Sequence, residues 1–507
     1  MSLQNLRELL EARAGRAPDK TFLFSERDGR SFTYREFDAA VDRAASMLSA
    51  RGTGKGDVVS LLLPNGVEYI IAYFACFKLG ALAGPVNSLL KPEEMAYVVG
   101  NSEARTLLYD SQFAPQVEEV RAAVPALADA LVFDDESEAT AAAGASEGWR
   151  GTRLGPEDEA IIIYTSGTTG KPKGCLLTHA NLIANARQIV EWLGFGEDDR
   201  LLTVMPLFHM NAVSVTTVSA LYAGGSTVVS PRFSASRFWQ IIDEYKITSF
   251  GSVATMLSML LATYPEGVPE GLSAESLRFA MCGSAPVPAE VLRRFEETFG
   301  CLVVEGYGLS ESTCRSTFNP PDARRRAGSC GMPIGNEMRV VDEEDGELPD
   351  GESGEIVMRG ENVFKGYFKN EEATRRAFRG GWFHTGDVGY RDAEGFYHLI
   401  DRKSDMIIRG GENVYPREID ELLYRHPAIA EAAAVGVPDD LYGEEVAAFV
   451  VAKEGRAVTP GEVTDYCREH LADFKCPKTV RVVPALPKGP TGKVLKRELQ
   501  ALWRKDE

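Results

Sequence analysis

The stretch "AIIIYTSGTTGKPKG", residues 160–174, joins an apolar run to a loop rich in glycine, hydroxyl groups and lysine. The apolar residues predict a buried strand, and "THANLIANARQIVEWLG" after them predicts a helix that ends at Gly194. We therefore expect the loop to lie between a strand and a helix, where backbone N–H groups and the helix dipole favour anions. The sequence predicts a phosphate-binding loop.

The residue types of this loop suit a phosphate. Glycine permits close approach of the backbone, hydroxyl groups donate hydrogen bonds, and lysine supplies positive charge. The candidate ligands are Thr165, Ser166, Gly167, Thr168, Thr169, Gly170, Lys171 and Lys173. The loop is not a Walker A motif, GxxxxGK[ST], because positions 165 and 172 hold threonine and proline. This excludes the P-loop nucleotide hydrolases.

Outside the loop, helix-like and strand-like segments alternate, as in "DVVSLLLP", "LLTVMP" and "KITSFGSV" followed by "ATMLSMLLATY". This alternation predicts an α/β fold with largely parallel sheets flanked by helices. From about Gly328 the segments become short, glycine-rich and strand-like, which indicates a small β subdomain. Helical signals resume after Asp401–Asp405 and predict a C-terminal α+β domain of about a hundred residues.

Composition excludes several classes of protein. The 507 residues, 44% hydrophobic and 25% charged, are too many for one compact core and predict two or more folded units. The net charge of -19 disfavours a nucleic-acid partner, because clustered lysine and arginine bind phosphate backbones. The most apolar stretch, "YIIAYFACFKLGALAG" from Tyr69, is too short to span a membrane. The eight cysteines contain no CxxC pair and predict reduced thiols without zinc. We expect a cytoplasmic protein with no integral membrane segment.

Six further motifs follow in the chain. They are "PLFHMN" (206–211), "GSAP" (283–286), "GYGLSES" (306–312), "HTGD" (384–387), "DRKSDMIIRGGENVYPREIDE" (401–421) and "LPKGPTGKVLKREL" (486–499). Together with the loop they resemble the adenylate-forming superfamily, which contains acyl-CoA synthetases, luciferases and the adenylation domains of peptide synthetases. The resemblance covers nearly the whole chain and favours the acyl-CoA synthetase branch.

The resemblance implies an activity in two steps. A carboxylate attacks the α-phosphate of ATP and expels pyrophosphate, and coenzyme A then accepts the acyl group. Lys493 is expected to contact the α-phosphate and the carboxylate, Glu311 to hold Mg²⁺ with help from Thr168, and Thr165 to belong to the catalytic set. His209 matches a position at the mouth of the acyl pocket, although a lone histidine beside apolar residues is also a common structural residue.

The resemblance also implies an ATP site. Tyr307 is expected to stack on adenine, Asp387 to accept the ribose hydroxyls and Arg402 to assist it. Ser310 stands where the family often has threonine, and either hydroxyl can donate to a phosphate. The full set of expected ATP contacts outside the loop is Gly283, Ser284, Ala285, Pro286, Gly306, Tyr307, Gly308, Ser310, Asp387, Arg402 and Lys493.

Coenzyme A and a rotating domain follow from the same resemblance. A large N-terminal domain, residues 1–403, would hold the acyl and ATP sites, and a small domain, residues 404–507, would rotate between the half-reactions about a hinge near Asp401–Ser404. Many relatives carry Asp or Lys at the hinge position where this chain has Ser404, and a small residue can absorb the dihedral change. The residues that match coenzyme A positions are Gly410, Gly411, Tyr442, Phe474 and Lys478.

Several alternatives stay open at the level of sequence. A stand-alone enzyme that loads an acyl carrier protein would share every motif, and a nucleotide-binding regulator without catalysis is a further alternative, although Lys493, Glu311 and Asp387 are all present. Malonate-activating relatives carry an arginine where this chain has Gly306, which disfavours malonate. Arg315 is either a contact for a polar or anionic tail or a structural residue. The sequence leaves open whether the chain forms a homodimer.

Overall fold

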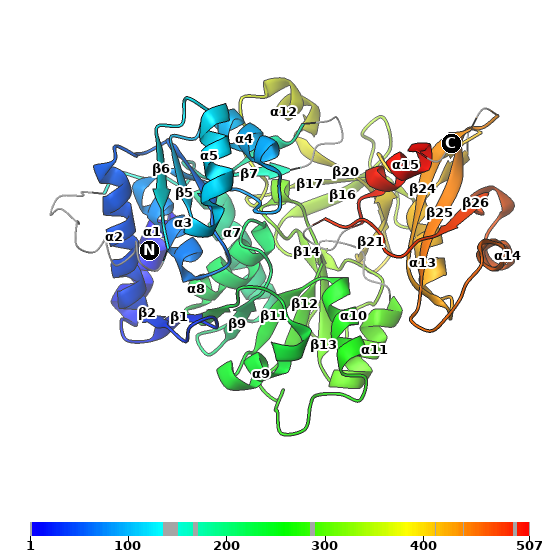
Figure 1. Ribbon diagram of the computed structural model, residues 1–507, viewed down its shortest axis with the longest axis horizontal. Helices are drawn as coiled ribbons and strands as arrows, with labels where there is room; N and C mark the ends of the chain where they lie inside the picture. The colour runs from blue at the N-terminus through cyan, green and yellow to red at the C-terminus, as the bar shows by residue number, and fades with distance from the viewer. Residues whose placement is uncertain are drawn as a thin grey trace.

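The computed structural model describes residues 3–134, 151–165, 171–283, 289–410, 412–439, 441–489 and 494–505. Within these residues the chain forms two large mixed sheets, a smaller antiparallel sheet and a separate C-terminal α+β unit (Figure 1). The C-terminal elements, orange and red in Figure 1, lie at the opposite end of the long axis from the blue N-terminal helices. The α/β class predicted from the alternating segments is confirmed.

The first large sheet is parallel at its centre. Strands β1 and β9–β13 run parallel, whereas β2, β14 and β15 pair antiparallel at the two edges. In sheet order the described strands are β15 (Met332–Pro333), β14 (Thr317–Phe318), β13 (Leu302–Tyr307), β12 (Phe279–Cys282), β11 (Ser249–Ser252), β9 (Arg200–Thr203), β10 (Ser226–Val229), β1 (Thr21–Ser25) and β2 (Ser31–Thr33).

The second large sheet is also built mainly of parallel strands. Strands β3–β7 run parallel, and β8 and β18 are antiparallel to their neighbours. In sheet order the described strands are β18 (Gly366–Tyr367), β8 (Lys173–Thr178), β7 (Glu159–Thr165), β4 (Leu82–Pro85), β3 (Val58–Leu62), β5 (Thr106–Tyr109) and β6 (Asp129–Val132).

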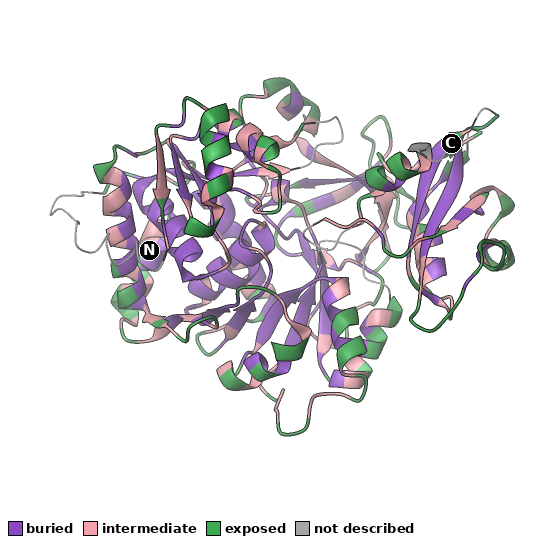
Figure 2. Ribbon diagram, viewed as in Figure 1, coloured by how far each residue is buried: buried purple, intermediate pink, exposed green. Residues whose placement is uncertain are grey.

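Helices cover the outer faces of these sheets and fill the space between them (Figure 2). In the large domain they are α1 (Leu6–Arg16), α2 (Tyr34–Ala50), α3 (Val67–Leu79), α4 (Pro92–Asn101), η1 (Ser111–Phe113), α5 (Ala114–Ala123), α7 (His179–Leu193), the π-helix η2 (Asn211–Val218), α8 (Ser219–Ala223), α9 (Ala235–Tyr245), α10 (Ala254–Thr263), α11 (Ala289–Phe299), η3 (Ser310–Ser312) and α12 (Glu371–Ala377). No helix of the described residues combines the length and hydropathy needed to cross a bilayer.

Helix α3 shows why the most apolar stretch of the sequence belongs to the core. Every residue of α3 is buried, and the helix contacts strands of both large sheets. Lys78, the one lysine of this helix, is 1% exposed, and its Nζ lies 2.6 Å from Asp38 Oδ1 and 2.5 Å from Asp42 Oδ1. A buried ammonium is tolerated here because two carboxylates of α2 pair with it.

The β subdomain expected after about Gly328 is present as an antiparallel sheet. Its described strands are β16 (Glu337–Val341), β17 (Gly354–Arg359), β20 (Trp382–Arg391), β19 (Phe378–Arg379) and β21 (Tyr397–Arg402). Strand β20 carries the "HTGD" motif and pairs with β21, which places Asp387 opposite Arg402. The pairing of these two strands therefore brings two predicted ATP residues together.

The C-terminal unit has its own core, in which a sheet packs on helices. Its described elements are β22 (Ile407–Arg409), β23 (Glu412–Val414), α13 (Pro416–Tyr424), β24 (Ile429–Asp439), β25 (Gly443–Ala452), α14 (Pro460–His470), η4 (Asp473–Lys475), β26 (Thr479–Val482) and α15 (Lys496–Lys505). Pro416 occupies the first turn of α13, and Thr459 and Glu462 form the capping box of α14, as their sequence patterns predict.

The surroundings of the glycine-rich loop differ from the prediction. Strand β7 is followed by β8, which pairs antiparallel with it from Thr165 and Lys173 back to Glu159 and Thr178. The loop therefore joins two antiparallel strands, and helix α7 begins only at His179, with Thr178 as its N-cap. The expected contribution of a helix dipole at the loop was wrong, because "KGCLLT" was not identified as a strand. The expected end of α7 at Gly194 is confirmed.

The cysteines are free thiols, as the sequence predicts. All eight are without disulfides, and seven of them are buried. Among the described residues, no group of three or more His, Cys, Asp or Glu side chains is arranged to hold a metal ion. Two of the thiols, Cys282 and Cys330, line the large cleft that is described next.

Candidate active site

A cleft of about 1190 Å³ lies between the large domain and the C-terminal unit. From the large domain it is lined by the carboxyl ends of β12 and β13 and by β20 and β21. From the C-terminal unit it is lined by α13, β24 and the start of α15. The predicted site residues among its lining are Gly283, Gly306, Tyr307, Gly308, Asp387 and Arg402. The carboxyl ends of parallel strands are the usual place for a ligand in an open α/β sheet.

Asp387 is the centre of a charged cluster in this cleft. Its Oδ2 accepts a hydrogen bond of 2.6 Å from the hydroxyl of Tyr307, and its Oδ1 lies 2.9 Å from Nε of Arg402. The carboxylate is 5% exposed, and the Arg402 guanidinium beside it has its pKa raised, first by the negative charge of Asp387. The structure thus brings together Tyr307, Asp387 and Arg402, which are far apart in the sequence.

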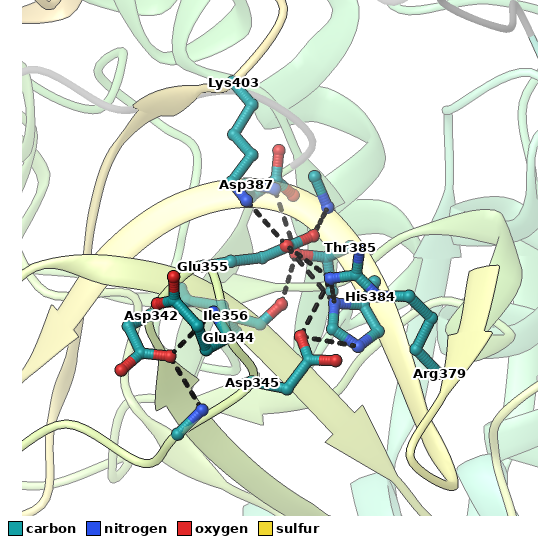
Figure 3. A network of polar contacts seen from close by, with 12 residues as sticks. Asp342, Glu344, Asp345, Glu355, Ile356, Arg379, His384, Thr385, Asp387 and Lys403 are labelled. Carbon is teal, nitrogen blue, oxygen red and sulfur yellow. Dashed lines mark hydrogen bonds and ion pairs between the residues drawn. The ribbon is translucent and has the colours of Figure 1, made fainter. Parts of the chain in front are cut away.

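A second polar network holds the backbone on either side of Asp387 (Figure 3). Thr385 donates from its hydroxyl to the carbonyl of Ile356 at 2.7 Å and accepts from the N–H of Asp387 at 3.0 Å. Glu355 accepts from the N–H of Gly386 at 3.0 Å and from Nζ of Lys403 at 2.8 Å. These bonds fix the turn that carries Asp387 and tie Lys403, beside the expected hinge, to the β subdomain.

Glu355 is the acidic centre of this network. Burial would raise the pKa of its carboxyl, but the hydrogen bonds from Lys403 and from His384, at 3.2 Å, lower it below the ordinary value. Glu355 is therefore ionised at neutral pH and can hold the Lys403 ammonium in place. Its role was missed in the sequence, where "SGEIVMRG" shows only a strand.

Glu311, the predicted magnesium ligand, lies at η3 directly after β13. It is 8% exposed, and burial raises the pKa of its carboxyl. Its Oε1 accepts from the hydroxyl of Tyr367 at 3.0 Å and from that of Thr165 at 3.4 Å. Thr165 is the last residue of β7, so the acidic residue of one motif faces the beginning of the glycine-rich loop. Ser310 precedes Glu311 on the same short helix.

Two lysines flank the other end of that loop. Nζ of Lys171 lies 5.2 Å from the ring centroid of Tyr97, and Nζ of Lys173 lies 5.2 Å from that of Tyr367. Tyr367 therefore contacts Lys173 through its ring and Glu311 through its hydroxyl. The expected loop ligands Ser166, Gly167, Thr168, Thr169 and Gly170 lie outside the described residues, as do Ser284, Ala285, Pro286, Gly411 and the expected catalytic Lys493.

The predicted coenzyme A residues form a separate group on the C-terminal unit. The N–H of Gly410 donates to the carbonyl of Tyr442 at 2.9 Å, and Nζ of Lys478 lies 2.8 Å from Asp439, which also accepts from the N–H of Tyr442 at 3.0 Å. Phe474, on η4, packs against the core of the unit. None of these side chains is among the described residues that line the cleft.

His209 precedes the π-helix η2, is half-buried and lies outside the charged cluster. Its Nε2 is buried and has no hydrogen-bond partner among the described residues, and its ring centroid lies 4.7 Å from that of Phe208. Burial lowers the pKa of His209 to about 4, so the ring is neutral at pH 7. The place of His209 at the mouth of the acyl pocket stays a prediction.

Sequence reasoning missed an ion pair at the small-domain wall of the cleft. Nζ of Lys496 lies 3.3 Å from Asp420 Oδ2, and both residues line the cleft. Burial raises the pKa of Asp420 to about 6. Both residues stand within quoted motifs, "YPREIDE" and "LKREL", but nothing in the two patterns indicates that they meet.

Two family models match the chain, one over most of the large domain and one over most of the C-terminal unit. Residues 10–368 match the family described as AMP-binding enzyme, and residues 418–493 match the AMP-binding enzyme C-terminal domain. The chain is 37% identical to a sulfoacetate–CoA ligase of Cupriavidus necator over 97% of each chain. It is 36% identical to an oxalate–CoA ligase of Arabidopsis thaliana and 35% identical to a long-chain-fatty-acid–CoA ligase of Mycobacterium tuberculosis, over 98% of each chain in both cases.

Solved structures show the same fold. ATP-bound MatB from Rhodopseudomonas palustris superposes with a TM-score of 0.92 at 32% identity, over 99% of each chain. Apo MatB from the same organism gives a TM-score of 0.80 at the same identity and coverage. The described structure is thus closer to the ATP-bound arrangement. The match to both family domains, and to relatives aligned over almost the full length, shows that the chain belongs to the AMP-binding enzyme family.

Proposed function

We propose that the protein is an ATP-dependent carboxylate–CoA ligase. A carboxylate oxygen attacks the α-phosphorus of ATP, the bond to the β-phosphate oxygen breaks, and pyrophosphate leaves. The sulfur of coenzyme A then attacks the acyl carbon, and AMP leaves with the electron pair of the broken bond. The observation that supports this best is the buried carboxylate of Glu311 facing the start of the glycine-rich loop, in a chain aligned end to end with CoA ligases.

The cluster around Asp387 suits a ribose. A carboxylate accepts hydrogen bonds from two adjacent hydroxyls, and the ion pair with Arg402 and the hydrogen bond from Tyr307 orient it. Tyr307, 7% exposed at the end of β13, would place its ring beside adenine. Gly283, Gly306 and Gly308 bring bare backbone to the same edge of the cleft, where the nucleotide can approach closely.

The residues present fit a magnesium ion bound together with ATP. Glu311 is a buried carboxylate whose described partners are hydroxyl groups, and it forms no ion pair with a described residue. Mg²⁺ commonly takes one or two carboxylates and completes its octahedral shell with phosphate oxygens and water. When bound, the ion would neutralise charge on the phosphates. Thr168 is proposed as the assisting hydroxyl.

Lys493 is proposed as the residue that stabilises the adenylation transition state. Two anions, the carboxylate and the α-phosphate, must approach each other, and a preorganised cation offsets their repulsion. Lys493 follows the "GPTG" segment and immediately precedes Val494, which lines the cleft. The remaining lysines at the phosphates would be Lys171 and Lys173.

The second half-reaction is proposed to use the group on the C-terminal unit. Gly410 and Gly411 would line the pantetheine arm, and Tyr442, Phe474 and Lys478 would lie along coenzyme A. Since the described members of this group lie away from the cleft, the unit would have to rotate, and we place the domain boundary at residues 403 and 404. An enzyme that loads a carrier protein would need the same rotation and remains the alternative acceptor.

The test is pyrophosphate release with a panel of carboxylic acids, with and without coenzyme A. We expect one class of acid to give turnover that depends on coenzyme A, and Lys493→Ala to reduce adenylation by about a hundred-fold or more. Lys369→Ala, which changes an exposed lysine paired with Glu103, is the control and should match the wild type. Pyrophosphate without any CoA thioester would favour a carrier protein, and ATP binding without pyrophosphate for any acid would favour a regulator.

A further inference from the structure

Arg315 is a buried guanidinium without a counterion. The residue lies between η3 and β14 and is 1% exposed. Nη1 makes a long hydrogen bond of 3.4 Å to the carbonyl of Gly306, and Cζ lies 5.4 Å from the ring centroid of Phe318. Nε and Nη2 are buried and have no partner among the described residues. Most of the five N–H donors of this side chain are therefore unused.

A structural role would demand a carboxylate, and none of the residues that the structure describes places one there. No described residue forms an ion pair with Arg315, and neither of the undescribed stretches 166–170 and 284–288 contains Asp or Glu. Lys78 shows how this protein buries a cation when the role is structural, with two carboxylates within 2.6 Å. A buried charge left without such a partner is costly, and a ligand that supplies the anion would remove that cost.

The guanidinium lies against the strand ends where the cleft begins. A Cβ placed on Gly283, at the end of β12, would be 2.5 Å from Nη1 of Arg315. Gly283 and Gly306 both line the cleft, and the Gly306 carbonyl is the one that Nη1 reaches. Glycine at position 283 thus leaves the space that the guanidinium occupies, next to two residues that line the cleft.

A second unsatisfied polar side chain lies on the same face of this sheet. Asn211, the first residue of η2, is 4% exposed, and neither its Oδ1 nor its Nδ2 has a partner among the described residues. A Cβ on Gly251 would lie 2.7 Å from that Oδ1. Gly251 pairs with Met281 on the neighbouring strand, and alternation along β12 puts Met281 and Gly283 on one face. Asn211 and Arg315 therefore lie over adjacent strand ends.

Asn185 of α7 fixes this arrangement. Its Nδ2 donates to the carbonyl of Arg315 at 2.6 Å, while its Oδ1 accepts from the Arg315 N–H at 3.3 Å and from the hydroxyl of Ser214 at 3.0 Å. Ser214 belongs to the π-helix that begins with Asn211, and π-helical turns often accompany functional sites. One buried amide thus anchors the backbone of Arg315 to the helix that carries Asn211.

We propose that Arg315 and Asn211 bind a second anionic group, a carboxylate or a sulfonate, at the far end of the acid that the enzyme activates. This inference rests on the proposed ligase function and names its substrate class. A guanidinium can donate two parallel hydrogen bonds to either anion, and the amide of Asn211 adds a neutral donor. The substrate is then a short acid with charge at both ends, and acids with an apolar tail are rejected.

The test compares acids in matched pairs on the full-length enzyme. Succinate is paired with butanoate, glutarate with pentanoate, and sulfoacetate with propanoate. The first two pairs test a carboxylate at the far end of the acid, and the third tests a sulfonate. We expect kcat/KM for adenylation to favour the dianion of at least one pair by about a hundred-fold or more, because a substrate without the second anion leaves buried polar groups of the site unpaired.

The variants are Arg315→Met, Arg315→Lys and Asn211→Ala. The control is Arg187→Met, since Arg187 is a partly exposed arginine of α7 paired with Glu361. Arg315→Met should lower kcat/KM for the dianion by about a hundred-fold and leave that of the monoanion within about five-fold. Arg315→Lys should recover part of the loss. An equal loss on both acids would mean that Arg315 is a structural residue and would overturn the proposal.

A binding measurement separates this proposal from the ligase function itself. Turnover of monoanions alone by the wild type would support a ligase and refute the anion site. If no acid of the panel turns over, isothermal titration of the dianions in the presence of AMP decides the matter. Binding that Arg315→Met abolishes would support the anion site without the ligase function, and absence of binding would refute it.

Discussion

Burial strongly shifts the pKa of one acidic residue of the cleft, Glu305. Glu305, on the outermost parallel strand β13, is 9% exposed, and its carboxylate accepts one hydrogen bond, from the N–H of Gly328 at 3.3 Å. Burial raises the pKa of its carboxyl to about 8, and the nearby charges of Arg417 and Arg325 offset only part of this effect. The side chain lines the cleft in its neutral form at pH 7.

Glu305→Gln should therefore change stability in a pH-dependent way. An unfolded chain releases the Glu305 proton near pH 4.5, whereas the folded protein keeps it to about pH 8. The stabilisation that the protonated Glu305 carboxyl gives to the folded state is fully present below pH 4.5. It is lost as the pH rises through 8. The glutamine variant should match the wild type near pH 5 and be more stable by about 1–3 kcal/mol near pH 9. Thermal unfolding across this range measures the difference.

A variant whose advantage instead grew toward low pH would contradict the assignment. Glu297→Gln, on the exposed face of α11, provides the control, because its carboxylate is half exposed and paired with Arg293. Its stability relative to the wild type should vary little between pH 5 and pH 9.

At the scale of elements, the end of β13 and the turn after it hold five predicted site residues, Gly306, Tyr307, Gly308, Ser310 and Glu311. A Cβ on Gly308 would overlap the carbonyl of Cys314, so the chain must carry glycine where it turns from the strand into η3. That turn determines the position of Glu311. Replacement of this glycine must displace either the strand or the short helix that carries the carboxylate.

Gly308→Ala should lower stability by about 3 kcal/mol and reduce adenylation as well, because the backbone overlap cannot be relieved by a rotamer change. The matched control is Gly54→Ala, where a Cβ would have no neighbour within 4 Å and the change should stay within about 1 kcal/mol. Differential scanning calorimetry and pyrophosphate release measure the two effects. Normal activity in a folded Gly308→Ala protein would show that the turn does not position Glu311.

The elements that can be predicted well are those indicated by a pattern within a short segment of sequence. The capping boxes that start at Thr33 and Thr459, and the apolar run of α3, depend on neighbours within a few residues, so a sequence pattern is enough to indicate them. Strand β8 was missed because "KGCLLT" is short and directly follows the loop, so its pairing with β7 decides its conformation. The hydroxyl of Tyr367 reaches Glu311 across 56 residues, and no pattern within either segment indicates that contact.

At the scale of the whole molecule, the two proposed half-reactions require two positions of the C-terminal unit. Asp401 accepts from the N–H of Arg417 at 2.9 Å, and Arg417 donates from Nη1 to the carbonyl of Leu399 at 2.7 Å. These two bonds of Arg417 hold the unit in its present position, and the Lys403–Glu355 contact fixes the large-domain side of the expected hinge. Ser404 lies beside them and donates only from its hydroxyl, to Asp405 at 3.1 Å, among the described residues.

Ser404→Pro should separate the half-reactions. Proline fixes φ and resists a dihedral change, yet it removes no backbone hydrogen bond that Ser404 makes within the described structure. We expect ATP–pyrophosphate exchange to stay within about three-fold of the wild type and CoA thioester formation to fall by about ten-fold or more. Ser404→Ala is the control and should preserve both rates. Equal loss of both rates would place the hinge elsewhere.

The sequence could predict the division into a large and a small domain and six of the residues that line the cleft, because the motifs name them. It could not predict which charges lack partners. Arg315 was open to either role, and only its burial without a carboxylate distinguishes them. Counterions come from distant segments, so their presence or absence is a property of the folded chain.

The reactivity of the two thiols in the cleft can report on the position of the C-terminal unit. Burial raises the pKa of both Cys282 and Cys330 to about 12, and alkylating reagents react with the thiolate. The other six cysteines do not line the cleft. A closed cleft should therefore suppress labelling, and each opening should admit the reagent and solvate the sulfur. The rate of alkylation of these two native cysteines would therefore measure how often the cleft opens. No additional cysteine or label would have to be introduced.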